Sequence, residues 1–343
     1  MADKLIVRDF GPIKNAELDI RKTTLLIGPQ GSGKSTLAKL VAMIYNKPFH
    51  STEPPTYNTD FYLEDYDIQD YKKESTFLTY NAGSLNVKID KNEFSYTGSS
   101  SLIKPVLIPT ERNLISIISS AIFGLTAGNI ALPKHILTFG AEYELFRRNT
   151  KDVMIPHLGI TYRNIRGLDF VFHDENNYLP LSSSASGYQS IIPIQLVLEN
   201  APLYYDDICY IIEEPELNLY PITQKRLVNY IISKSNNLKK QALLTTHSPY
   251  VLSSLNNLLF AYKVAQRHPE QTAEISRIIP RESWLNPDEF AAYFVADGTV
   301  RSIVNPKTGL ISENELDGVS EDIGDEFDTL MEIYSEKANE GSY

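Results

Sequence analysis

The chain has little of what builds disulfide frameworks, zinc clusters or membrane spans. Its 343 residues contain one cysteine, Cys209, which lies inside an apolar run and is expected to be a buried, inert thiol. One cysteine can form neither a disulfide framework nor a cysteine-based zinc site. No apolar run approaches the roughly 20 residues that cross a membrane, and the N-terminus lacks the apolar core of a signal peptide. These features predict a cytoplasmic protein with no membrane partner.

Positive charge is also scarce. The chain has 32 Lys and Arg residues against 43 Asp and Glu residues, which gives a net charge of -11. The surface as a whole therefore does not favour nucleic acid, although a local basic face remains open because net charge says little about distribution. With 42% hydrophobic and 22% charged residues the composition is that of an ordinary globular protein. The length predicts one large domain or a core domain with an insertion.

A glycine-rich loop near the N-terminus has the clearest chemical signal. Residues 28–35 read G-P-Q-G-S-G-K-S and fit the phosphate-binding pattern G-x-x-x-x-G-K-S, between an apolar run and a stretch of helix formers. Glycines let successive backbone N–H groups surround an anion at the positive end of a helix. Lys34 would contact the β- and γ-phosphates of a nucleoside triphosphate, and the Ser35 hydroxyl would ligate Mg²⁺. The residues expected to bind nucleotide are Gly28, Pro29, Gln30, Gly31, Ser32, Gly33, Lys34, Ser35 and Thr36.

A second motif is an apolar strand that runs into carboxylates, Y-I-I-E-E-P-E at residues 210–216. At the carboxyl end of a parallel strand these acids would lie beside the phosphate loop. Glu213 is predicted to hold Mg²⁺, directly or through water, and Glu214 to orient or deprotonate the attacking water. The alternative, a pair of solvated loop acids, fits the preceding apolar strand less well.

A third motif, A-L-L-T-T-H-S-P at residues 242–249, is a strand that ends in a histidine. Ser248 is expected to cap the following helix, with Pro249 at its first position. His247 is predicted to contact the γ-phosphate or its water, while a purely structural hydrogen bond is the alternative.

A small-residue loop, S-S-S-A-S-G-Y-Q-S at residues 182–190, leads into an apolar helix. By itself this loop could be a flexible linker. Small side chains before a helix N-terminus also make an anion site, as at the phosphate loop.

In this order the four motifs resemble an ABC-type ATPase head. The resemblance is closest to the AAA family ATPases that include RecF, SMC heads and the OLD-like ATPases of bacterial anti-phage systems. It implies ATP and Mg²⁺ as cofactors. It also implies a signature loop, with Ser186, Gly187 and Gln189, that closes over ATP held by a second copy. The resemblance therefore implies a head-to-tail homodimer or higher oligomer, which forms when ATP binds and dissociates when ATP is hydrolysed.

Some positions depart from that pattern. Glu213 stands where ABC transporters have aspartate, and Ala185 replaces the usual serine of the signature, which leaves open whether Ser186 supplies the hydroxyl. The Q-loop is not recognisable, and Gln69 is the candidate for it and for an additional Mg²⁺ ligand. Residues 109–112, P-T-E-R, are similar to a segment of compact ATPases and have no assigned chemical role.

The predicted fold is α/β: a P-loop NTPase with a mostly parallel central sheet, an N-terminal antiparallel strand layer and a mixed α+β insertion. We expect a single domain with its nucleotide-binding core at residues 1–47 and 180–265, and an inserted lid-like subdomain at 48–179. Residues 266–343 are expected to form C-terminal strands, with a hairpin turn at Asp297-Gly298, then an acidic helix and tail. Within the insertion, residues 114–123 and 135–148 are expected to be helices.

The resemblance implies that the chain is the sensor or regulatory ATPase of an anti-phage system, such as PARIS or Septu, which controls a separate toxin or nuclease. The alternative is a RecF-like repair ATPase that binds DNA through a basic groove. The candidate cations for that groove are Arg147, Arg148, Lys151, Arg163, Arg166, Lys239 and Lys240. For the first cluster, Arg147 and Arg148 with Lys151, we prefer the interpretation that these cations lie at a helix C-terminus and satisfy its dipole.

Overall fold

The computed structural model describes residues 3–46, 59–91, 93–98, 103–118, 131–148, 150, 152–156, 158–236, 240–312 and 323–334. One large sheet dominates these residues. Its strands are β1 (Asp3–Phe10), β2 (Ile13–Ile20), β3 (Thr23–Ile27), β4 (Phe77–Ala82), β5 (Leu85–Asp90), β6 (Glu93–Thr97), β7 (Lys104–Ile108), β12 (Ile208–Glu213), β13 (Lys240–Thr246), β14 (Phe290–Ala296) and β15 (Thr299–Ser302). Their order is β6-β5-β4-β1-β2-β15-β14-β3-β13-β12-β7.

The centre of this sheet is parallel. Strands β14, β3, β13, β12 and β7 are consecutive neighbours and all pair in parallel. Strands β3 and β12 are buried along their whole length, as expected for parallel strands covered on both faces. The α/β class with a mostly parallel centre is therefore confirmed. The N-terminal antiparallel strands do not form a separate layer, because β15 pairs with β2 and joins them to the same sheet.

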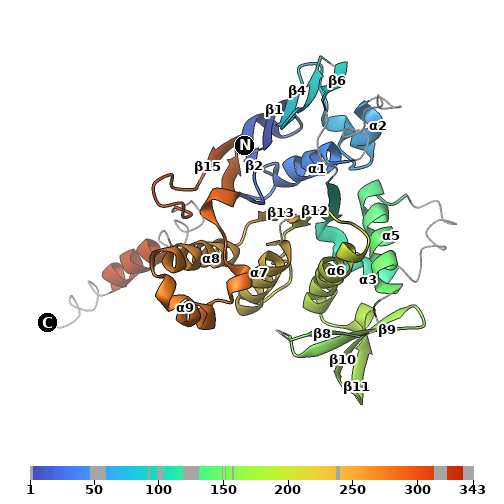
Figure 1. Cartoon of the computed structure of the whole chain (residues 1–343), viewed down its shortest axis with the longest axis vertical. Helices are drawn as coiled ribbons and strands as arrows, with labels where there is room; N and C mark the ends of the chain where they lie inside the picture. The colour runs from blue at the N-terminus through green and yellow to red at the C-terminus, as the bar shows by residue number, and fades with distance from the viewer. Residues whose placement is uncertain are drawn as a thin grey trace.

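Helices cover both faces of the parallel strands. They are α1 (Lys34–Ile44), α5 (Lys134–Arg148), α6 (Ser186–Asn200), α7 (Pro221–Ser235) and α8 (Pro249–Arg267). Figure 1 shows α1 on one side of β12 and β13, and α6, α7 and α8 on the other. Along β12 the side chains alternate accordingly. Ile208 and Ile212 belong to the core beneath α6–α8, whereas Cys209 and Ile211 belong to the core that contains α1. The same alternation places Glu213 on the α1 side.

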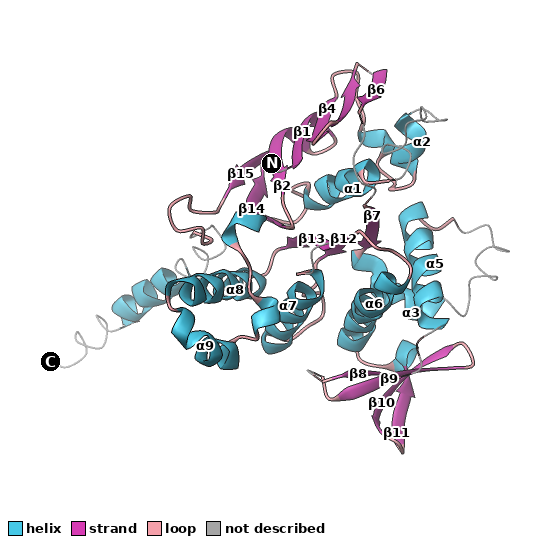
Figure 2. Cartoon of the chain, viewed as in Figure 1, coloured by secondary structure: helices cyan, strands magenta, loops and turns pink. Residues whose placement is uncertain are grey.

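The predicted insertion does not form one separate unit. Strands β4–β6 extend the main sheet and β7 pairs with β12, so much of residues 48–179 belongs to the core. Among the described strands of this region, β8 (Asp152–Ile155), β9 (Ile160–Ile165), β10 (Leu168–Asp174) and β11 (Asn177–Pro180) form a sheet of their own, seen as a separate group of arrows in Figure 2.

The remaining elements are short. They are the helices α2 (Thr59–Glu64), α3 (Ile115–Ile118) and α9 (Thr272–Ile278), and the 3-10 turns η2 (Gln69–Tyr71), η3 (Thr110–Leu114), η4 (Leu181–Ser183), η5 (Ala201–Leu203), η6 (Pro269–Gln271), η7 (Arg281–Ser283) and η8 (Pro287–Glu289). The helix predicted at 135–148 is confirmed as α5. The helix predicted at 114–123 is described only to residue 118, where η3 and α3 form it. None of the described helices is both long and apolar enough to cross a membrane.

The C-terminal part contributes more to the core than expected. Strand β14 pairs with β3, so the core sheet extends beyond the predicted boundary at residue 265. The hairpin turn is confirmed: Ala296 faces Thr299 across Asp297 (φ +53°) and Gly298 (φ +78°), the positive angles of a two-residue turn. Residues 323–334 are helical and exposed, as predicted, and the tail beyond them lies outside the described residues.

Candidate nucleotide-binding and catalytic site

The phosphate loop connects the end of β3 to the first residue of α1. Three of its glycines have positive φ: Gly28 (+154°), Gly31 (+75°) and Gly33 (+104°). A Cβ atom on Gly28 would lie 2.1 Å from the carbonyl oxygen of Val295 in β14. The loop therefore packs directly on a strand from the far end of the chain. Only glycine fits that approach without displacing backbone.

Lys34 points into this loop. Its Nζ donates hydrogen bonds to the carbonyl oxygens of Gly28 (2.8 Å) and Pro29 (2.7 Å), and the residue is 5% exposed. Burial lowers the pKa of Lys34, and the carboxylates of Glu214 and Glu216 oppose this shift. The nearby Ser32 hydroxyl is buried and has no partner among the described residues. The loop thus presents a cation and a free hydroxyl, both suited to phosphate oxygens.

Glu213 is the buried acid of the second motif. It is 2% exposed, and burial raises the pKa of its carboxyl, although a hydrogen bond from the Ser35 hydroxyl lowers it. Its second oxygen, Oε1, is buried and has no hydrogen-bond partner within the described part of the chain. A hydroxyl beside an unsatisfied carboxylate oxygen fits Mg²⁺, which binds few protein oxygens and keeps several waters. Ser35 and Glu213 are therefore suited to hold the ion.

Glu214 and His247 lie close together although 33 positions separate them in the sequence. The His247 Nδ1 atom is 3.3 Å from Oε1 of Glu214. The Glu214 backbone has a φ of +42°, and its N–H donates to the Thr245 carbonyl oxygen (2.9 Å). Such a conformation costs about 1–2 kcal/mol in a residue other than glycine. The ends of β12 and β13 thus hold the carboxylate beside the histidine.

Glu216 had no predicted role, and the structure makes it the support of this turn. It is 5% exposed, and its Oε1 accepts hydrogen bonds from the Thr246 hydroxyl (2.5 Å) and from the His247 backbone N–H (3.0 Å). Because both donors lie at the end of β13, Glu216 ties the second motif to the third. Its position after Pro215, at a turn, was the only sequence signal for such a role. Ser248 caps α8 as predicted, accepting from the N–H of Tyr250 (3.2 Å).

The signature loop precedes α6. Ser186 is the first residue of α6 and is exposed. A Cβ atom on Gly187 would lie 3.1 Å from the carbonyl oxygen of Asn218, which belongs to the segment that follows β12. Gln189 was expected to contact nucleotide, but its Nε2 atom donates to the carbonyl oxygens of Ser182 (3.3 Å) and Ser184 (3.0 Å). In this structure Gln189 therefore orders the loop instead of pointing out of it.

Gln69 does not join the cluster among the described residues. The contact of its side-chain amide is with Asp70 (3.5 Å), and its role as a magnesium ligand remains a prediction. The segment that follows β7 lies beside the site instead, because β7 and β12 are parallel neighbours and end at the same edge of the sheet. That segment carries Glu111, whose carboxylate contributes to the raised pKa of Glu213.

Arg112 follows Glu111 and is fully buried. Its guanidinium donates to backbone oxygens of Pro109, Glu213, Glu214 and Ser190 and to the Ser190 hydroxyl. Nothing in the P-T-E-R sequence itself indicates these partners, which lie in segments far apart along the chain.

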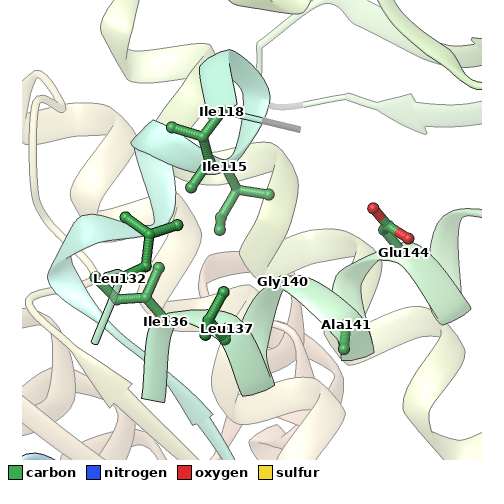
Figure 3. A pocket seen from close by; sticks show the side chains of 8 residues that line it. All are labelled: Ile115, Ile118, Leu132, Ile136, Leu137, Gly140, Ala141 and Glu144. Carbon is green, nitrogen blue, oxygen red and sulfur yellow. The ribbon is translucent and has the colours of Figure 1, made fainter. Parts of the chain in front are cut away.

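A separate apolar pocket lies between α3 and α5 (Figure 3). Among the described residues, Glu144 is the only charged one that lines it, and none of the described lining residues belongs to the nucleotide site. The lining residues are Ile115, Ile118, Leu132, Ile136, Leu137, Gly140, Ala141 and Glu144.

Comparison with known proteins places the chain in a family. Residues 1–122 and 113–252 match the family model of the AAA ATPase domain, and the chain belongs to that family. It is also similar to the SMC head domain from Thermotoga maritima, with 12% identity, coverage of 88% of this chain and 98% of that one, and a TM-score of 0.44.

Two further solved structures are similar. The Smc head domain from Pyrococcus furiosus bound to the C-terminal domain of ScpA has 10% identity, covers 88% of this chain and 95% of that one, and has a TM-score of 0.45. The dimeric ATP-binding cassette MJ0796 bound to ADP and Pi has 13% identity, coverage of 87% and 97%, and a TM-score of 0.36. A search of curated proteins found no match.

Proposed function

We propose that the chain binds ATP with Mg²⁺ at residues 28–36 and hydrolyses it. One observation carries this proposal: the hydroxyl of Ser35, next to the buried Lys34 at the start of α1, bonds to Glu213 at the end of β12, and one oxygen of Glu213 is buried without a partner among the described residues. A bound Mg²⁺ would neutralise charge on the β- and γ-phosphates. Ser35 and Glu213 are the residues that would hold it.

Glu214 is the proposed catalytic residue. It follows the buried acid directly, its backbone is held by Thr245, and its carboxylate lies 3.3 Å from His247. A carboxylate in that place can orient a water for attack on the γ-phosphate and accept its proton. His247 is half exposed and close enough to contact the same water or the phosphate.

The experiment that tests hydrolysis is release of phosphate by purified full-length protein. Glu214→Gln should lower kcat by about 10²–10⁴-fold, the usual contribution of a positioned acid or base, with ATP affinity retained. Glu274→Gln in α9 is a matched control, because it makes the same change at an exposed position. Equal kcat values for Glu214→Gln and wild type would contradict the assignment.

The nucleotide site is also proposed to act as a self-association switch. The signature loop supports this: Ser182, Ser183 and Ser186 are exposed, and they lie at the positive end of the 15-residue helix α6. A γ-phosphate held by a second copy could accept hydrogen bonds there. ATP would then join two copies in a head-to-tail arrangement, and hydrolysis would separate them.

The finer role, control of a separate effector in anti-phage defence, rests on the resemblance of residues 213–221 and 245–249 to OLD-like ATPases. It is tested by phage plating on cells that carry the gene in its natural neighbourhood, with wild-type chain or Glu214→Gln. Protection that is absent in wild type, or unchanged by the variant, would contradict this role.

The alternative, DNA binding through a basic groove, loses two of its candidate clusters. Arg147 pairs with Asp169 (3.0 Å), and Arg163 pairs with Asp152 (3.1 Å) and Glu175 (2.7 Å). These carboxylates neutralise the cations that the groove would need. Lys151 and Lys239 lie outside the described residues.

A further inference from the structure

Arg112 is a buried cation whose hydrogen bonds are all made to backbone oxygens and one hydroxyl. Its Nε donates to Ser190 O (3.0 Å), Nη1 to Pro109 O (3.0 Å) and Glu213 O (2.7 Å), and Nη2 to Ser190 Oγ (3.0 Å) and Glu214 O (2.7 Å). A guanidinium has five N–H donors in a rigid plane, so every donor is used. Burial lowers the pKa of Arg112 to about 10, which the surrounding glutamates oppose, so the group stays charged at neutral pH.

One end of the guanidinium plane bonds to the backbone of Glu213 and Glu214, the turn at the end of β12. The carbonyl groups of Glu213 and Glu214 belong to the two peptide units on either side of the Glu214 Cα atom. The two hydrogen bonds of 2.7 Å that Arg112 donates therefore orient both peptide units. The bond from the Glu214 N–H to the Thr245 carbonyl oxygen fixes the first of these units from its other side. The positive φ of Glu214 is held by these partners.

The other end of the guanidinium plane bonds to Ser190 in α6, the helix that follows the signature loop. Ser190 lies in the first turns of α6, four residues after Ser186, and both its hydroxyl and its carbonyl oxygen accept from Arg112. A shift of α6 by about 1 Å must either move the guanidinium or break these bonds, because hydrogen bonds weaken steeply with distance and angle. The guanidinium has no internal torsion that could absorb the shift.

We propose that Arg112 is a positioning residue that makes the orientation of Glu214 depend on the position of α6. Contact between the signature loop and a nucleotide held by a second copy would move α6 and, through Arg112, set Glu214 for hydrolysis. This inference rests on the proposed ATPase function. It assigns a role to the P-T-E-R segment as the link between the two halves of a composite site.

The test compares Ser190→Ala, Arg112→Lys and a matched control, Ser254→Ala. Ser254 is also a buried helical serine whose hydroxyl donates to a backbone carbonyl, that of Tyr250 (2.6 Å), and it has no bond to Arg112. ATP affinity, kcat and thermal stability are measured for the full chain. Lysine supplies three donors from one point and cannot replace a planar fork that serves five bonds.

The expected result is a fall in kcat of at least about fivefold for Ser190→Ala and more for Arg112→Lys, with ATP affinity within about twofold, as for loss of an interaction made only in the transition state. Wild-type kcat should rise with protein concentration, and this rise should be lost in Arg112→Lys. Ser254→Ala should match wild type. Wild-type kcat in Ser190→Ala would overturn the proposal. So would losses of ATP affinity and thermal stability that parallel the fall in kcat.

Self-association is tested separately from the role of Arg112. If wild-type protein hydrolyses ATP without any concentration dependence, the self-association mechanism fails. The kcat of Ser190→Ala against Ser254→Ala would then still show whether α6 positions Glu214 within one copy.

Discussion

Replacing Gly28 by alanine tests the packing of the phosphate loop on β14. A Cβ atom there would lie 2.1 Å from the Val295 carbonyl oxygen and 3.0 Å from its carbonyl carbon. Close carbon–oxygen contacts in proteins lie near about 3.3 Å, so the loop or β14 must move by about 1 Å. The φ of +154° is unfavourable for alanine as well.

The magnitude follows from three contributions. Overpacking costs about 1–3 kcal/mol, and the left-handed backbone costs about 1–2 kcal/mol. Alanine also lowers the conformational entropy of the unfolded chain, which stabilises the folded state by about 0.4–1 kcal/mol. The free energy of unfolding should therefore fall by about 1–4.6 kcal/mol.

Gly31→Ala is the matched control. Gly31 also has a positive φ, +75°, but a Cβ there would meet no atom within 4 Å. Because Gly31→Ala has no packing cost, its free energy of unfolding should fall by only about 0–1.6 kcal/mol. Urea unfolding of both variants without nucleotide measures the difference. Equal midpoints and equal slopes for the two variants would refute the close contact between the loop and β14.

Two further predictions concern the supports of the fold. Thr246→Val removes the hydroxyl that donates to Glu216 and leaves a buried carboxylate short of a partner, so the free energy of unfolding should fall by about 1–3 kcal/mol; urea titration measures it, and an unchanged midpoint would contradict the bond. Burial raises the pKa of Glu142 above its ordinary value of 4.5, although Lys104 opposes this. As pH rises from 4.5 through the raised pKa, the folded state holds this proton more tightly than the unfolded state, and this group's contribution to stability falls. Glu142→Gln should therefore flatten the decline of stability over that window and leave stability at pH 7.5 equal or higher, despite loss of the ion pair; a lower stability at pH 7.5 would contradict this reasoning.

Residues that act through local patterns could be predicted from the sequence. The loop at 28–35 follows a strand and begins a helix, Ser248 caps α8, and Asp297-Gly298 makes the hairpin turn. Each depends on a few adjacent residues whose conformational preferences agree. The expectation that the acids of residues 213–216 lie beside the phosphate loop used one further rule, that parallel strands end at the same edge of a sheet, whereas the contact between Glu214 and His247 was not predicted.

What depended on strand order and burial could not be predicted in this way. The apolar run of β14 could be identified as a strand, but nothing local places it beside β3 and against Gly28. Arg112 could not be given a role from the sequence, because its five acceptors come from three segments that only the fold brings together. Gln189 was predicted to contact nucleotide, whereas its amide nitrogen donates hydrogen bonds within its own loop.

The measurement that tests the central claim is light scattering of the full chain with ATP and Mg²⁺, for wild type, Glu214→Gln and Lys34→Ala. Glu214→Gln should retain unhydrolysed ATP and accumulate as a dimer or larger assembly, and removal of ATP should reverse this. Lys34→Ala should never assemble, because it lacks the charge that holds the phosphates. An assembly state that ignores nucleotide in all three proteins would contradict the ATP-dependent switch.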